Sequence, residues 1–246
     1  MKKTIISCVL FLTAVTAFSQ TPMKTAAEAK LSASDLAVKI ADRILATTTY
    51  EFKNTKTGKT YKSVKNLPLD MNVKVACKYN NWHYTNGVTH IALMELADKT
   101  GAKKYDDYVL KNMNFVFNEG NLDFFKKQYE QAMKNEGWYG VRKLSWHMIF
   151  RGKRLDDNGP MGASLIDLQM KHPNNSFLNY INETAEHLNY GEPRLADGTI
   201  ARIWPHENTI WADDAFMAIS FLARMAKMTG DMSYINDAAN QVIKYH

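Results

Sequence analysis

The sequence predicts an all-α protein built as an array of helical hairpins. Apolar residues recur at helical spacing along most of the 246-residue chain, and the alternation typical of strands is rare. A helix–glycine–helix pattern occurs twice, 129 positions apart. The composition, with 46% hydrophobic and 23% charged residues, is that of an ordinary globular chain, which excludes disordered, collagen-like and coiled-coil classes.

The first 19 residues have the pattern of a secretory signal peptide. Lys2 and Lys3 precede an apolar run that ends near Ala17, and small residues supply a cleavage site before Gln20. This run is too short to span a bilayer comfortably, and no later run is longer. We therefore expect residues 20–246 to be exported, to the periplasm or outside the cell, with no membrane partner.

Cysteine content and charge give two further expectations, one about disulfides and one about nucleic acid. Removal of the signal peptide leaves Cys77 as the only cysteine, so we expect no internal disulfide. The formal net charge is +6, but lysine and arginine are scattered and never form a run of five. Nucleic acid is therefore not an expected partner.

The first expected helix is followed by a long polar stretch. Ser34 is placed to cap a helix. The apolar face of this helix comprises Leu36, Ile40, Ile44 and Leu45. The polar stretch runs from Tyr50 to Asn81 and allows a hairpin at Asn54 to Thr60. A loop of that length in a compact domain is usually functional or disordered.

The internal repeat predicts three helical hairpins. The segment 93–107 matches the segment 222–236, with Gly101 and Gly230 as the helix stops. A fainter copy lies 72 positions after the first, with Pro173 in place of the glycine. This spacing indicates an open solenoid or a closed toroid. The alternative is that any two amphipathic hairpins share such a pattern.

Unusual segments precede the first helix of each hairpin. They read Trp82-His83-Tyr84-Thr85-Asn86-Gly87, Leu155-Asp156-Asp157-Asn158-Gly159-Pro160 and Ile210-Trp211-Ala212-Asp213-Asp214. The repeat makes Tyr84, Asp156 and Asp213 equivalent, and likewise Trp82 and Trp211. Stacked hairpins share an orientation, so these helix starts should lie along one rim. Aromatic faces there suit sugar rings, carboxylates supply acid and base groups, and helix starts favour an anionic ligand.

Each of these features also has a purely structural explanation. An aspartate before a helix is commonly a cap, and a Gly-Pro step such as Gly159-Pro160 is typical of a helix start. Trp82, Trp204 and Trp211 can equally be core residues. Two Asp-Asp pairs at equivalent positions beside tryptophan favour a site, because capping does not require them.

No motif points to a metal or a cofactor. His83, His147 and His206 lack metal-ligand spacing, and the chain has no phosphate-binding loop and no nucleophile elbow. We therefore expect no metal and no cofactor.

The segments 154–163 and 211–225 resemble the unsaturated rhamnogalacturonyl hydrolases of glycoside hydrolase family 105. These enzymes are relatives of the unsaturated glucuronyl hydrolases of family 88. The segment 82–87 is similar to the first aromatic motif of the family. The resemblance extends from about Ser34 to the last residue.

This resemblance implies a fold and a reaction. The fold is an (α/α)6 toroid of six helical hairpins, of which residues 20–246 would form an N-terminal part of about three and a half. The substrates are pectin- and rhamnogalacturonan-derived oligosaccharides whose terminal uronic acid carries a C4=C5 double bond. The reaction is hydration of this vinyl ether, and it uses no cofactor.

The resemblance also implies roles for site residues. Asp213 would be the general acid and base, and Asp157 the second carboxylate. Trp211 would stack on the sugar and Tyr84 would line the pocket. The other expected substrate-binding residues are Trp82, Asp156, Arg202 and His206. Family members often carry a histidine eleven residues before the catalytic aspartate, where this chain has Arg202, a side chain able to clamp the substrate carboxylate.

Two other classes of function remain open from the sequence. A non-catalytic oligosaccharide-binding protein, or an inactive fragment of the enzyme, can use the same aromatic rim. A helical repeat protein that binds other proteins needs neither the paired carboxylates nor the tryptophans.

Overall fold

The computed structural model describes residues 32–151 and 154–245 and divides the chain into two compact units, residues 1–40 and 41–246. The described part of the first unit contains the beginning of α2 (Ala33–Thr47). The Ser32 hydroxyl accepts a hydrogen bond from the Asp35 amide at 3.1 Å, so Ser32 caps this helix in place of the predicted Ser34. The predicted signal peptide lies outside the described residues.

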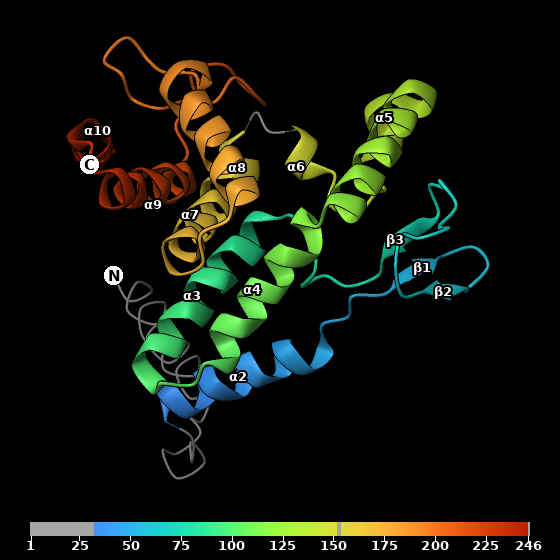
Figure 1. Ribbon diagram of the computed structural model, residues 1–246. Coiled ribbons are helices and arrows are strands. Elements are labelled where there is room, and N and C mark those ends of the chain that lie inside the picture. Colours follow the sequence, from blue (N-terminus) through green and yellow to red (C-terminus); the bar gives the residue numbers. More distant parts are fainter. Residues whose placement is uncertain (1–31, 152–153, 246) are drawn as a thin grey trace, which may run out of the picture. The chain divides into compact units, whose positions relative to one another are not determined.

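The second unit is dominated by three helical hairpins (Figure 1). They are formed by α3 (Tyr84–Thr100) with α4 (Lys104–Phe117), α7 (Leu155–Lys171) with α8 (Asn175–Glu186), and α9 (Ala212–Thr229) with α10 (Met232–Lys244). The first helices form one row, in which α7 packs between α3 and α9, and each second helix packs on its own partner. This arrangement confirms the predicted all-α class and is consistent with an arc of a toroid.

Two hairpins turn at the predicted glycines. Gly101 and Gly230 adopt left-handed conformations, with φ of 70° and 76°, and their amides bond to the carbonyls of Ala97 and Ala226. A side chain would strain both turns, which explains why glycine ends these helices. The first helix of the middle hairpin, α7, ends at His172 without a glycine, as the fainter copy of the repeat predicts.

The first helices also approach each other at glycines. A Cβ atom on Gly87 would overlap the backbone of Pro160, and one on Gly159 would overlap Met217. The first turn of α3 is therefore in backbone contact with the second turn of α7, and α7 and α9 also approach closely. Pro160 lies inside α7 rather than at its start, because Asp156 and Asp157 already form the first turn.

The polar stretch forms a small sheet instead of a structureless loop. It contains β1 (Phe52–Asn54), β2 (Thr60–Tyr61) and β3 (Val73–Val75), in the antiparallel order β2-β1-β3. Phe52 pairs with Tyr61 and Val75, and the Asn54 side chain accepts amide hydrogen bonds across the turn. The predicted hairpin is thus confirmed.

The remaining elements lie between successive hairpins along the chain. These are α5 (Glu119–Val141), α6 (Met148–Arg151) and the π-helix η1 (His187–Gly191). Gly137 interrupts α5 with φ of 60° and sets the direction of the last turn, which carries Trp138.

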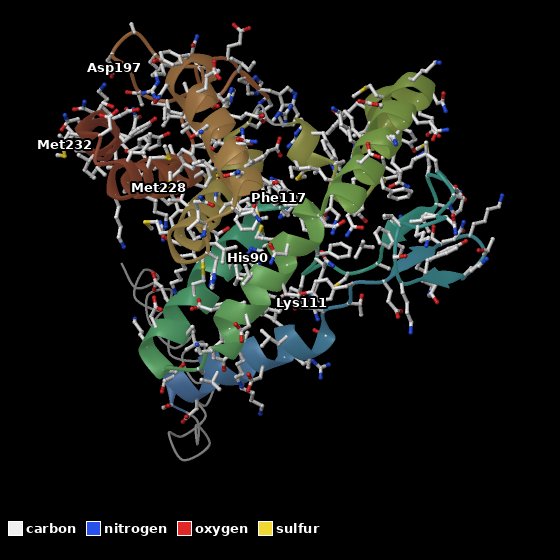
Figure 2. All side chains as sticks on the ribbon, viewed as in Figure 1. His90, Lys111, Phe117, Asp197, Met228 and Met232 are labelled. Carbon is white, nitrogen blue, oxygen red and sulfur yellow. The ribbon has the colours of Figure 1, made fainter. Side chains whose placement is uncertain are left out.

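The core joins the three hairpins through aromatic side chains. Trp82 is fully buried and lies 4.8 Å from the Tyr180 ring and 6.1 Å from the Phe117 ring, measured between centroids. His90 on α3, labelled in Figure 2, is 1% exposed, and burial lowers its pKa to about 4. No helix among the described residues is long and apolar enough to cross a membrane.

Candidate active site

The start of α9 supplies the central pair of the site. Asp213 and Asp214 occupy its first turn, and the Trp211 backbone caps it. The Asp214 side chain is 2% exposed and accepts two hydrogen bonds from Arg202, at 2.6 Å from Nε and 2.7 Å from a terminal nitrogen. A β-bridge to Thr209 fixes the Arg202 backbone. The loop before α9 therefore presents a guanidinium to the helix start that follows it.

Arg202 also connects the starts of α7 and α9. One of its terminal nitrogens lies 3.4 Å from Asp156 and 3.9 Å from Asp213, and its guanidinium stacks 4.2 Å from the Trp211 ring centroid. Asp213 is the more open carboxylate, with 56% of its side chain exposed against 28% for Asp156. The predicted convergence of aromatic and acidic groups is therefore present at these two helix starts.

Three carboxylates thus surround a single guanidinium. The hydrogen bonds to Asp214 raise the pKa of Arg202, which stays charged. Burial raises the pKa of Asp214 above its ordinary value although Arg202 opposes the shift. The nearby charges of Asp213 and Asp156 add to this rise, so the pKa shift in the cluster falls on the buried Asp214.

Asp157 belongs to a separate ion pair. Its side chain is fully buried and bonds through both oxygens to Arg151, and the Arg151 guanidinium stacks 5.1 Å from the Trp138 ring centroid. The Trp82 indole donates a hydrogen bond of 2.6 Å to the Asp157 carbonyl. Asp157 is therefore held in the protein interior by groups from α6 and from the segment before α3.

A cavity of about 280 Å³ opens beside the Arg202 cluster. Its lining includes Asp156, Arg202 and Asp214, together with a pair in which Glu192 lies 2.8 Å from His187 Nε2. Burial raises the pKa of Glu192 to about 7, and the nearby negative charge of Asp214 adds to this shift. A second proton-holding group therefore lies in the same cavity as the aspartates.

The sequence comparison agrees with this geometry. Residues 55–246 match Glycosyl Hydrolase Family 88. The chain belongs to this family. No curated protein matches the sequence. The expected relation to family 88 is thus confirmed.

Solved structures show the same fold at low identity. A possible GH105 family member from Klebsiella pneumoniae subsp. pneumoniae MGH 78578 is 13% identical, with a TM-score of 0.51 over 88% of this chain. A possible GH105 family member from Salmonella enterica subsp. enterica serovar Paratyphi A str. ATCC 9150 is 14% identical, with a TM-score of 0.51 over 87% of this chain. The family 88 chain spans 48% of the length of each.

The structure brings together only some of the predicted site residues. Asp156, Asp213 and Trp211 each contact the Arg202 guanidinium. The prediction of a substrate contact at Trp82 is wrong, because its side chain is fully buried and offers no face to a ligand. The repeat aligned Trp82 with Trp211, which is 41% exposed, but sequence alone does not show which tryptophan faces the core.

Tyr84, His206, Asp213 and Trp211 lie outside the cavity lining, although Asp213 and Trp211 contact Arg202, which lines it. Tyr84 is the first residue of α3, is 38% exposed and packs 4.5 Å from the His83 ring. His206 is exposed, and its carbonyl accepts a hydrogen bond from the Thr209 hydroxyl.

Several residues of this candidate site were not predicted. Arg151 and the His187–Glu192 pair have no recognisable motif, and the cavity is also lined by Arg154 and Trp204. The available signal was a set of arginines shortly before each Asp-Asp pair, at positions 151, 154 and 202. Among the described residues, no group of three histidine, cysteine or acidic side chains is arranged to hold a metal.

Proposed function

We propose that this family 88 chain is part of a glycoside hydrolase acting on oligosaccharides with an unsaturated terminal uronic acid from pectin or rhamnogalacturonan. The observation that carries the proposal is the Arg202 cluster, in which a half-exposed Asp213 adjoins two further carboxylates and the Trp211 ring. Addition of water to an enol ether needs a group that donates a proton and a group that accepts one. Carboxylates beside an aromatic surface suit this reaction on a sugar ring.

In the proposed reaction, Asp213 donates its proton to C4 of the uronic acid. The positive charge that develops at C5 is stabilised by the ring oxygen, and water adds at C5 while a carboxylate accepts its proton. The resulting hemiketal opens to a ketone at C5, which leaves a hemiacetal at C1, and this hemiacetal breaks down to an aldehyde and releases the next sugar. Trp211 supports the ring, because Arg202 orients the indole and leaves 41% of it exposed.

The second carboxylate is assigned to Asp156 in this proposal. Asp156 shares Arg202 with Asp213 and lines the cavity, whereas Asp157 is buried and bonded to Arg151. Asp157 acts as a positioning residue that holds Arg151 and, through its carbonyl, Trp82. This proposal therefore differs from the motif similarity, which implies that Asp157 is the second carboxylate.

The test follows the ultraviolet absorbance of the conjugated enol ether in an unsaturated disaccharide. The wild-type protein should remove it, and Asp213→Asn should lose about 100-fold or more of the turnover, since general acid–base groups contribute roughly 10² to 10⁴. Asp107→Asn is the matched control, because Asp107 is an exposed aspartate in the first turn of α4, away from the cavity. Binding without loss of absorbance would support an oligosaccharide-binding protein instead.

Export is a separate part of the proposal. It is supported by the signal-peptide pattern before Gln20, and N-terminal sequencing of the mature protein from the producing cell tests it. A mature chain that still begins at Met1 would contradict it.

A further inference from the structure

We propose that Arg154, at the edge of the cavity beside the Arg202 cluster, binds the carboxylate of the substrate's terminal uronic acid. The inference rests on the proposed function and names the group that selects an acidic sugar over its uncharged ester. It concerns a residue to which neither the motif similarity nor the proposed reaction gives a role.

Arg154 is the cavity arginine whose donors are available. It is exposed, and no described residue accepts a hydrogen bond from its side chain or forms an ion pair with it. Its backbone is fixed, because the Arg154 carbonyl accepts hydrogen bonds from the amides of Asp157 and Asn158 in the first turn of α7. A fixed backbone and a free guanidinium are the requirements for capturing a ligand at a defined place.

Trp204 orients this guanidinium. The central carbon of the Arg154 guanidinium lies 5.6 Å from the centroid of the Trp204 ring, which is itself 63% exposed. Stacking occupies the face of a guanidinium and leaves its edge of N–H donors free. That edge matches a carboxylate, which accepts two parallel hydrogen bonds from arginine.

Arg202, the residue expected from sequence to clamp the substrate carboxylate, is poorly suited to this role. Two of its nitrogens already bond to Asp214, and Asp156 and Asp213 adjoin the same guanidinium. A fourth carboxylate would be repelled by the three present. His187 is also engaged, since its Nε2 lies 2.8 Å from Glu192.

The cavity has room for a terminal sugar. Its volume of about 280 Å³ is just below the range of ligand pockets, roughly 300 to 1,000 Å³, which also hold molecules larger than one sugar. Arg154 lines the same cavity as Asp156 and Asp214. A sugar whose carboxylate sits on Arg154 can therefore present its ring to the aspartate cluster.

The experiment compares a free acid with its methyl ester. Binding of an unsaturated uronic acid disaccharide and of its methyl ester is measured by calorimetry in the Asp213→Asn background, where turnover does not interfere. Arg154→Met should weaken binding of the acid by roughly 10- to 100-fold, the range for hydrogen bonds to charged groups, and binding of the ester by less than about threefold. Arg154→Lys should fall between, because it keeps the charge and loses the paired donors.

Arg142→Met is the matched control, because Arg142 is an exposed arginine outside the cavity, and it should leave both affinities unchanged. Equal losses for acid and ester, an Arg154→Met variant that binds as the parent does, or a parent that does not bind the acid would each overturn the inference. Failure of the proposed function looks different. In that case the wild-type protein binds the acid through Arg154 but leaves the ultraviolet absorbance of the enol ether unchanged.

Discussion

The two Asp-Asp pairs begin equivalent helices but lie in different surroundings. In both pairs the second aspartate is buried and bonds through two oxygens to an arginine from the preceding connection, Arg151 for Asp157 and Arg202 for Asp214. The difference lies in what else each arginine contacts. Arg151 stacks on Trp138, whereas Arg202 also reaches the first aspartates of both pairs.

This difference shows how a repeated motif can separate into a structural part and a chemical part. The pair at Asp157 is closed, since its carboxylate has no exposed surface. The pair at Asp214 is open, because three carboxylates lie near the single guanidinium of Arg202 and Asp213 is exposed. The repeat therefore predicts where acidic groups gather, and the arginine contacts decide which of them remain available to a substrate.

The largest expected effect is on stability, at the closed pair. Asp157→Asn should lower the free energy of unfolding by about 3 to 5 kcal/mol, because it leaves the Arg151 charge unpaired in the interior. Asp214→Asn should cost less, about 1 to 3 kcal/mol, because Asp156 and Asp213 still neutralise Arg202. Urea unfolding of both variants measures the comparison.

A double variant separates charge pairing from simple loss of packing. Arg151→Met combined with Asp157→Asn should recover part of the lost stability, since it removes the unpaired charge. Equal losses in the Asp157→Asn and Asp214→Asn variants, with no recovery in the double variant, would show that the two pairs do not differ in the way described.

The stability of the protein should also depend on pH through Glu192, which lines the cavity together with Asp214. The folded-state pKa of Glu192, about 7, lies above the ordinary value of 4.5, so the folded protein holds a proton that the unfolded chain releases. Stability from this group is complete below about pH 4.5 and is lost as pH rises through 7, with a total of about 3 kcal/mol.

Glu192→Gln tests this dependence, because glutamine keeps the shape and does not titrate. The free energy of unfolding of the wild-type protein should fall more steeply between pH 5 and pH 7 than that of the variant. If the free energy of unfolding falls equally with pH in both proteins, Glu192 does not cause the dependence. The aspartates would then be the titrating groups of the cavity.

Much of the fold could be predicted because it depends on local patterns. The helix stops at Gly101 and Gly230 follow from the left-handed conformation that glycine alone adopts without strain. The hairpin of β1 and β2 was also expected from the sequence, whereas the third strand and the π-helix at His187 had no such signal.

The candidate site was less predictable, because its contacts are non-local. The repeat correctly placed Asp156 and Asp213 together, but Arg202 reaches Asp156 across 46 positions of sequence. The burial of Trp82 depends on Phe117 and Tyr180, which belong to other helices. An aromatic motif specifies the side chain, whereas the fold determines whether that side chain faces the core or the solvent.

The smallest expected effect is at Asp156, the first aspartate of α7. Its contact with Arg202 is long, at 3.4 Å, and 28% of its side chain is exposed, so Asp156→Asn should change the free energy of unfolding by less than about 1 kcal/mol. If Asp156 is the second carboxylate of the reaction, turnover should nevertheless fall by about 100-fold, because asparagine does not accept the proton of the attacking water. Parallel urea unfolding and ultraviolet assays separate the two quantities. A large loss of stability with turnover retained would give Asp156 a structural role, as proposed for Asp157. Both aspartates of α7 would then be structural, and the aspartates with a chemical role would lie on α9.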